Sequence, residues 1–128
     1  MRLLLDTHSF LWFIAGSSNL SVAARALIEA GDNEKSVSIA SFWEMAIKLS
    51  LGWLAVAQPF ETMMRAQLDQ NGFGLLPITL SHLATVSTLP FHHRDPFDRL
   101  LIAQAKVEQL QVVTADPAFD TYAVGRLW

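Results

Sequence analysis

The chain has 128 residues, a formal charge of −3 and no cysteine. This length suits one domain over residues 1–128, which can bury a core without disulfide staples. The negative charge excludes salt-driven adhesion to nucleic acid through a basic surface, so an enzyme acting on phosphates would have to bring cations of its own. The absence of cysteine is compatible with a reducing cytosol, and we expect a cytoplasmic protein.

The sequence carries no sign of a targeting or membrane-spanning segment. The opening "MRLLLD" reaches an acid too early for the apolar region of a signal peptide. No run of about 18 apolar residues occurs, so no membrane span is expected. The apolar fraction of 52% is high, which suggests that some apolar surface serves a partner.

Hydrophobic runs and turn residues predict strands that alternate with helices. Ser21 is the expected N-cap of one helix, and Gly16 and Gly31 are expected to end two of them. In chain order the predicted elements are strand 1–5, helix 7–16, helix 21–31, strand 35–40, helix 41–52, helix 59–72, edge strand 73–79, helix 81–89, a loop and long helix in 92–109, strand 110–116 and a short last strand within 119–128. The alternation indicates an α/β fold with a mostly parallel sheet and helices on both faces.

Two acids follow predicted buried strands directly. Asp6 comes after "LLL" and Asp116 after "VVTA". Ligand sites in parallel sheets lie beyond the carboxyl ends of the strands, so these carboxylates converge if their strands are neighbours. The alternative is that each acid only caps the following helix or turn, a role that suits aspartate equally well.

Glu44 lies in "SFWEMAIK", where Ser41 and Glu44 have the spacing of a capping box at a helix start. That local interpretation is the simpler one. Apolar residues surround Glu44, however, and so apolar a neighbourhood is unusual for an acid that only caps a helix. We therefore keep Glu44 as a candidate site residue beside its capping interpretation.

A second pair of acids opens the long helix in "RDPFDRLLIAQA". Asp95 fits the N-cap, Pro96 the first helical position and Asp98 the third. Capping accounts for Asp95 well. It accounts for Asp98 less well, because a second acid in the first turn is helpful but not required.

Four acids thus stand at strand ends or helix starts: Asp6, Glu44, Asp98 and Asp116. If they share a pocket they repel each other, which a cation would relieve. Oxygen-only ligands select Mg²⁺ or Mn²⁺, whereas zinc is disfavoured because cysteine and paired histidines are missing. Such a cluster suits metal-assisted hydrolysis of a phosphodiester, with all four acids as metal-binding and catalytic candidates.

Other polar residues give weaker signals. The hydroxyls of Thr7 and Thr114 could orient a carboxylate, or could make ordinary strand-end hydrogen bonds. Arg99 could meet a phosphate or pair with Asp95 one helical turn away. His82 is expected on an exposed helix turn, and the adjacent histidines at 92 and 93 in a solvated or locally bonded loop.

The ordered set "LLLDTH", "SFWEMAIK", "HRDPFDRLLIAQA" and "VVTAD" resembles the PIN-domain family, and within it the VapC-type toxins of toxin–antitoxin pairs. The resemblance covers essentially the whole chain. It implies a three-layer α/β/α sandwich and a Mg²⁺- or Mn²⁺-dependent endoribonuclease with Asp6, Glu44, Asp98 and Asp116 as its acids. Thr114 matches the hydroxyl residue that often precedes the last of these acids.

The resemblance also implies a cognate antitoxin, an RNA substrate and a homodimer. Nearly every residue of "FLWFIAG" is apolar, although a short surface helix should show one polar face. We expect a partner to cover this helix, with Phe10, Trp12 and Phe13 as its contacts. Two other functions stay open: a binding module without catalysis, and a protein phosphorylated on Asp6.

Overall fold

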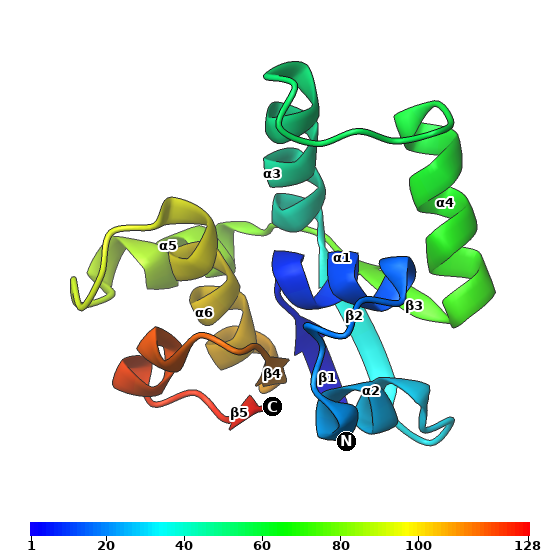
Figure 1. The fold of residues 1–128 in the computed structure, drawn as a ribbon. Helices are drawn as coiled ribbons and strands as arrows, with labels where there is room; N and C mark the ends of the chain where they lie inside the picture. Colours follow the sequence, from blue (N-terminus) through cyan, green and yellow to red (C-terminus); the bar gives the residue numbers. More distant parts are fainter.

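The computed structural model describes residues 1–128 and has a five-stranded parallel sheet between two layers of helices (Figure 1). The strand order is β3-β2-β1-β4-β5, and every neighbouring pair is parallel. The strands are β1 (Arg2–Leu5), β2 (Glu34–Ser38), β3 (Phe73–Leu76), β4 (Gln111–Val113) and β5 (Arg126–Leu127). The predicted three-layer α/β/α sandwich is confirmed, with β3 at one edge as expected.

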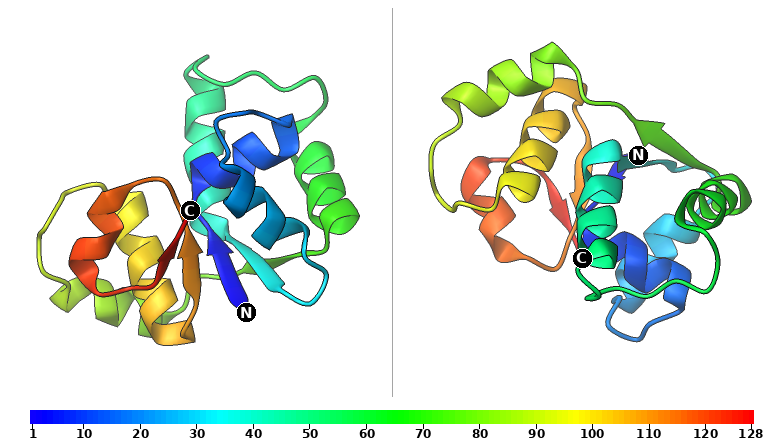
Figure 2. Two further views of the ribbon diagram at one scale, coloured as in Figure 1. Left: turned by 60° about the horizontal axis from the view of Figure 1, so that its bottom comes forward. Right: turned by 90° about the horizontal axis from the view of Figure 1, so that it is seen from above.

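The helices divide between the two faces of the sheet. They are α1 (Thr7–Ala15), α2 (Val22–Glu29), α3 (Ile39–Ser50), α4 (Phe60–Asn71), α5 (Leu80–Thr88), α6 (Pro96–Glu108) and the 3₁₀ helix η1 (Pro117–Tyr122). Figure 2 shows α5, α6 and η1 on one side of the strands and α1, α2 and α4 on the other. In Figure 1, α3 rises beyond the carboxyl edge of the sheet, between these two groups. None of the helices is long and apolar enough to cross a membrane.

The central strand β1 joins two separate hydrophobic cores. Leu3 and Leu5 pack in the core under α1, α2 and α4, together with Phe10. Leu4 points to the other face and packs with Leu101 and other residues of the core under α6 and η1. This alternation is the period of a strand that is buried on both faces, which is why "LLL" needs no polar position.

Local signals set most helix ends as predicted. Gly16 ends α1 in the left-handed conformation at φ 65°, where the absence of a β-carbon avoids strain. The Ser21 hydroxyl caps α2 by accepting from the Ala24 N–H at 3.0 Å. The end of α2 differs slightly, since its C-cap is Ala30 and not Gly31.

The predicted capping box in α3 is wrong. The helix begins at Ile39, and its N-cap is Ser38, whose hydroxyl accepts from the Ala40 N–H at 3.0 Å. Ser41 therefore lies inside the first turn, buried, and Glu44 lies one turn further on. The serine at the very end of β2 offers the earlier cap, and the chain turns into the helix there.

The expected exposure of His82 is also wrong. Its side chain is completely buried between α5 and α6, where its Nδ1 accepts from the Thr79 N–H at 3.0 Å. The Thr79 hydroxyl accepts from the His82 N–H at 3.3 Å, so the pair forms a reciprocal cap at the start of α5. A histidine serves here as a capping residue, which is an uncommon choice.

Candidate active site

The topology brings the predicted acids to one edge of the sheet. Asp6 follows β1 and Asp116 lies just beyond β4, and these two strands are paired in parallel. Asp98 lies in the first turn of α6, which begins at this same edge because α6 leads back to the start of β4. Glu44 lies on α3, which packs against α1 and α6.

Asp6 is buried and held by two donors. Its Oδ1 accepts from the Ser9 N–H at 2.8 Å, which caps α1, and its Oδ2 accepts from the Thr114 hydroxyl at 2.6 Å. The hydroxyl of Thr114 in turn accepts from the Asp116 N–H at 3.0 Å. The capping alternative and the contact expected of Thr114 are thus both present, and together they fix the orientation of the Asp6 carboxylate.

Two other acids act as caps with exposed side chains. Asp116 caps η1 through the Ala118 N–H at 2.9 Å. Asp95 caps α6 by accepting from the N–H groups of Phe97 and Asp98 at 2.9 and 3.0 Å, as predicted. Capping uses Oδ1 in both residues.

Glu44 is largely covered and pairs with a cation on its own helix. Lys48 Nζ lies 3.1 Å from Glu44 Oε2, and the two side chains are 28% and 14% exposed. This spacing of four residues is the usual one for an ion pair on a helix. Lys48 therefore competes with any metal ion for this carboxylate.

Asp98 stands out electrostatically. Burial, followed by the negative charges of Asp95, Asp6, Asp116 and Glu44, raises the pKa of Asp98 from 3.8 to about 7. Mutual repulsion of this kind is what several carboxylates around one point produce when no cation lies among them. The four predicted acids therefore lie within electrostatic reach of one another.

The carboxylates nevertheless do not converge to coordination distance as they stand. No three histidine, aspartate or glutamate side chains are close enough together to hold a metal ion. Asp6, Glu44 and Asp116 each face a protein partner, as described above, and Oδ2 of Asp98 lies 3.4 Å from Nε2 of His93. The donor chemistry fits a hard divalent cation, whose charge would offset the repulsion around Asp98.

The structure decides between the interpretations given for Thr7 and overturns both of those given for Arg99. The Thr7 hydroxyl donates to the Ser41 hydroxyl at 2.9 Å, so it ties α1 to α3 and orients no carboxylate. Arg99 is 5% exposed and neither reaches the surface nor pairs with Asp95. Its guanidinium donates to the carbonyls of Leu89 and Pro90 at 3.0 and 2.8 Å.

The apolar helix α1 is covered mostly by the protein itself. The prediction that Phe10 contacts a partner is wrong, because its ring is completely buried against Phe42 and Phe73. Trp12 and Phe13 are partly exposed, and the Trp12 ring lies against that of Trp128, with 5.9 Å between the ring centres. A helix with one face on the core and its remaining aromatic rings half-covered needs no fully polar face.

Sequence reasoning missed two residues around the acids. Lys48 could have been found from its spacing to Glu44. Tyr122 carried no such signal, because its hydroxyl reaches His93 across 29 positions in the sequence. Of the adjacent histidines, His93 is locally bonded, in line with one of the two interpretations given for that loop.

A parallel sheet with acids gathered at its carboxyl edge defines the class of fold, and comparison with known proteins gives the family. The sequence model of the PIN domain matches residues 3–125. The chain is 34% identical over 114 residues to Ribonuclease VapC22 of Mycobacterium tuberculosis, covering 88% of this chain and 85% of that protein. The protein belongs to the PIN domain family.

Solved structures agree with this assignment at the level of the fold. VapBC2 from Rickettsia felis, bound to a DNA fragment from its promoter, is similar with a TM-score of 0.69 and 14% identity, covering 99% of this chain and 98% of the matched one. A toxin–antitoxin complex from Klebsiella pneumoniae is similar with a TM-score of 0.67 and 16% identity, covering 98% and 96%.

Proposed function

We propose that this protein is an endoribonuclease that uses Mg²⁺ or Mn²⁺ and acts as the toxin of a toxin–antitoxin pair. Membership of the PIN domain family and similarity to a protein named Ribonuclease VapC22 support the nuclease. Similarity in fold to a toxin–antitoxin complex supports the biological setting. The observation that carries the proposal for the site is the raised pKa of Asp98 among four other acids.

In this proposal Asp6, Glu44, Asp98 and Asp116 hold the metal, with Asp6 and Asp98 as the principal ligands. Asp6 is oriented by Ser9 and Thr114 before any ligand arrives, which lowers the cost of ordering it. Asp98, with its pKa of about 7, exchanges its proton for a cation near neutral pH. A divalent ion bound here supplies a Lewis acid for phosphate oxygens and lowers the pKa of a water molecule.

We further propose that partner proteins cover the apolar surface near this site. The large apolar side chains of Trp43 and Ile47 on α3, and of Leu51 at its C-cap, follow one another at helical spacing and are 59%, 36% and 54% exposed. An exposed apolar stripe of this kind is typical of an interface. It supports an antitoxin contact or a homodimer contact, in addition to the partly exposed Trp12 and Phe13.

Calorimetric titration of Mn²⁺ into antitoxin-free protein tests the metal site, with Asp6→Asn and Asp98→Asn as variants. Asp32→Asn is the matched control, because it removes the same charge from an exposed residue outside the site. We expect binding in the wild type and the control and its loss in both site variants. Cleavage of an RNA mixture should follow the same pattern, and full cleavage by either site variant would remove that residue from the mechanism.

A second function, a binding module without catalysis, is favoured by one observation. Asp6 and Asp116 both act as helix caps, so their presence has a structural reason that is independent of metal. A folded wild type that binds no Mn²⁺, with or without RNA, and cleaves no RNA would support this module. Phosphorylation of Asp6 is disfavoured, because "DTH" lacks the second acid of a D-x-D pattern.

A further inference from the structure

His93, in the loop that leads into α6, directs its ring toward Asp98. Its Nε2 lies 3.4 Å from Asp98 Oδ2, and the two side chains are 20% and 24% exposed. This nitrogen is buried and makes no hydrogen bond to any protein atom. A buried ring nitrogen is ordinarily satisfied, so its position beside a site carboxylate calls for an explanation.

The other side of the ring shows which nitrogen carries the proton. The Tyr122 hydroxyl accepts from the backbone N–H of His93 at 3.0 Å and from Arg99 Nη1 at 3.2 Å. These two bonds use both acceptor positions of the hydroxyl oxygen. Its one proton has two acceptors within reach, His93 Nδ1 at 2.8 Å and the His93 carbonyl at 3.3 Å. The shorter contact makes Nδ1 the acceptor, so in the neutral ring Nε2 carries the N–H that faces Asp98.

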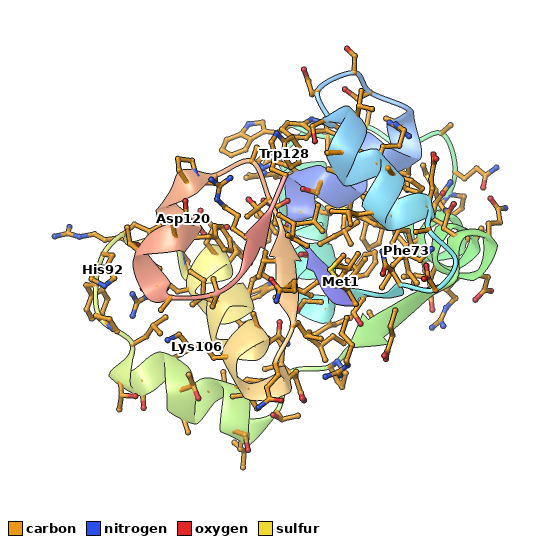
Figure 3. All side chains as sticks on the ribbon, turned by 90° about the horizontal axis from the view of Figure 1, so that it is seen from below. Met1, Phe73, His92, Lys106, Asp120 and Trp128 are labelled. Atoms are coloured by element: carbon orange, nitrogen blue, oxygen red, sulfur yellow. The ribbon has the colours of Figure 1, made fainter.

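This arrangement is anchored deep in the protein. Tyr122 is 2% exposed, and Arg99, which donates to it, is fixed by two backbone carbonyls and stacks on the Phe91 ring with 4.0 Å between the guanidinium carbon and the ring centre. The loop before α6 is thereby tied to η1; Figure 3 shows this loop, marked by His92, beside η1, marked by Asp120. The imidazole cannot rotate without breaking the bond to a buried hydroxyl.

We propose that His93 is a positioning residue whose Nε2–H, 3.4 Å from Oδ2 of Asp98, donates to this carboxylate when a divalent cation binds. Carboxylates that bind metals are themselves hydrogen-bonded, and loss of such a partner typically costs about 10–100-fold in metal affinity. Thr114 does the same for Asp6. Each of the two principal acids then has a protein donor beside its Oδ2 oxygen. This inference rests on the metal site proposed above.

Two substitutions of the same residue separate positioning from structure. In His93→Gln the amide reaches the position of Nε2 and can still donate to Asp98, whereas in His93→Asn it reaches only the position of Nδ1 and can still meet Tyr122. We expect Mn²⁺ affinity to fall about 10-fold or more in His93→Asn and to stay within about 3-fold of the wild type in His93→Gln. A purely structural role would give the opposite order, because only asparagine keeps the contact with Tyr122.

The neighbouring His92→Asn is the matched control. His92 is exposed, and its ring packs edge to face on Tyr122 with 4.9 Å between the ring centres. Since it does not face Asp98, its variant should bind Mn²⁺ as the wild type does, even though it too loses a contact with Tyr122. Metal-free urea denaturation of all variants checks that each is folded. Equal Mn²⁺ affinity in the wild type and in His93→Asn would overturn the role of His93 but would leave the metal site standing. No binding in the wild type would overturn the metal site itself, and this role with it.

Nuclear magnetic resonance of ¹⁵N-labelled histidine tests the contact without metal. Under mildly alkaline conditions, where histidine side chains are ordinarily neutral, His93 should carry its proton on Nε2. The Nε2 signal should shift in Asp98→Asn and stay unchanged in Asp32→Asn. A proton on Nδ1 would overturn the assignment of the proton to Nε2. An Nε2 signal that is unchanged in Asp98→Asn would overturn the contact with Asp98.

Discussion

The Thr114 hydroxyl donates to Oδ2 of Asp6 at 2.6 Å and joins residues that lie 108 positions apart in the sequence. The bond exists because β1 and β4 are parallel neighbours, so their carboxyl ends meet. Both side chains are buried there. A short bond from a neutral hydroxyl to a buried carboxylate is among the stronger hydrogen bonds in proteins.

Replacing Thr114 by valine keeps the shape of the side chain and removes this donor. We expect the free energy of unfolding to fall by about 2 kcal/mol, because Asp6 Oδ2 loses its partner in a buried position. Urea denaturation measures the loss, and Mn²⁺ affinity should fall in the same variant. Thr121→Val is the control, since the hydroxyl of Thr121 is exposed and donates only to a carbonyl of η1. Equal stabilities for the two variants would show that the bond contributes little.

Phe10 is expected to act through stability and not through a partner. Its ring meets Phe42 and Phe73 edge to face, with 5.5 Å between ring centres in each pair. Truncation to alanine should lower the free energy of unfolding by about 3–5 kcal/mol, as for other large core residues. Leu80→Ala, at a side chain that is 84% exposed, should change it by less than about 0.5 kcal/mol. Wild-type stability in Phe10→Ala would place the ring outside the core.

The sequence predicted all five strands and the six α-helices, because their signals are local, but it did not predict the 3₁₀ helix η1. The apolar "LLL", the Ser21 cap and the left-handed Gly16 each act within a few residues. Where two local signals competed, the prediction failed: Ser38 and Ser41 both fit a cap, and the serine at the strand end took that position.

The environment of the site could not be predicted, because it depends on contacts between distant segments. Convergence of the acids required knowing that β1 and β4 are neighbours, which no local pattern states. The burial of Arg99 depends on a loop that wraps around its guanidinium, and the orientation of His93 depends on Tyr122. Residue type alone could not distinguish these anchored side chains from solvated ones.

Lys48 should weaken metal binding by holding Glu44. Its ammonium lies 3.1 Å from the carboxylate, and both side chains are mostly covered, so the attraction is screened only in part. We expect Lys48→Met to tighten Mn²⁺ binding about 2–5-fold, as measured by calorimetry. Lys106→Met is the control. It removes the same charge from an exposed lysine that lies in the last turn of α6 and makes no ion pair. A similar change in both variants would assign the effect to net charge alone.

Asp98 should make the metal-free protein less stable as the pH rises. The pKa of its carboxyl is about 7 in the folded protein and 3.8 ordinarily, so the folded protein binds more protons than the unfolded chain between these values. The free energy of unfolding therefore falls as the pH rises through this window. The destabilisation is absent below about pH 4 and complete above about pH 7.

Asp98→Asn removes the group that titrates. In the presence of a chelator, this variant should gain about 1–3 kcal/mol in unfolding free energy over the wild type at about pH 8, and much less at about pH 4. Urea denaturation across this range measures the difference. Asp32→Asn should follow the wild-type profile, because Asp32 is exposed and lies outside the site. A constant difference between Asp98→Asn and the wild type at every pH would mean that the Asp98 carboxyl keeps its ordinary pKa and that the surrounding acids do not act on it.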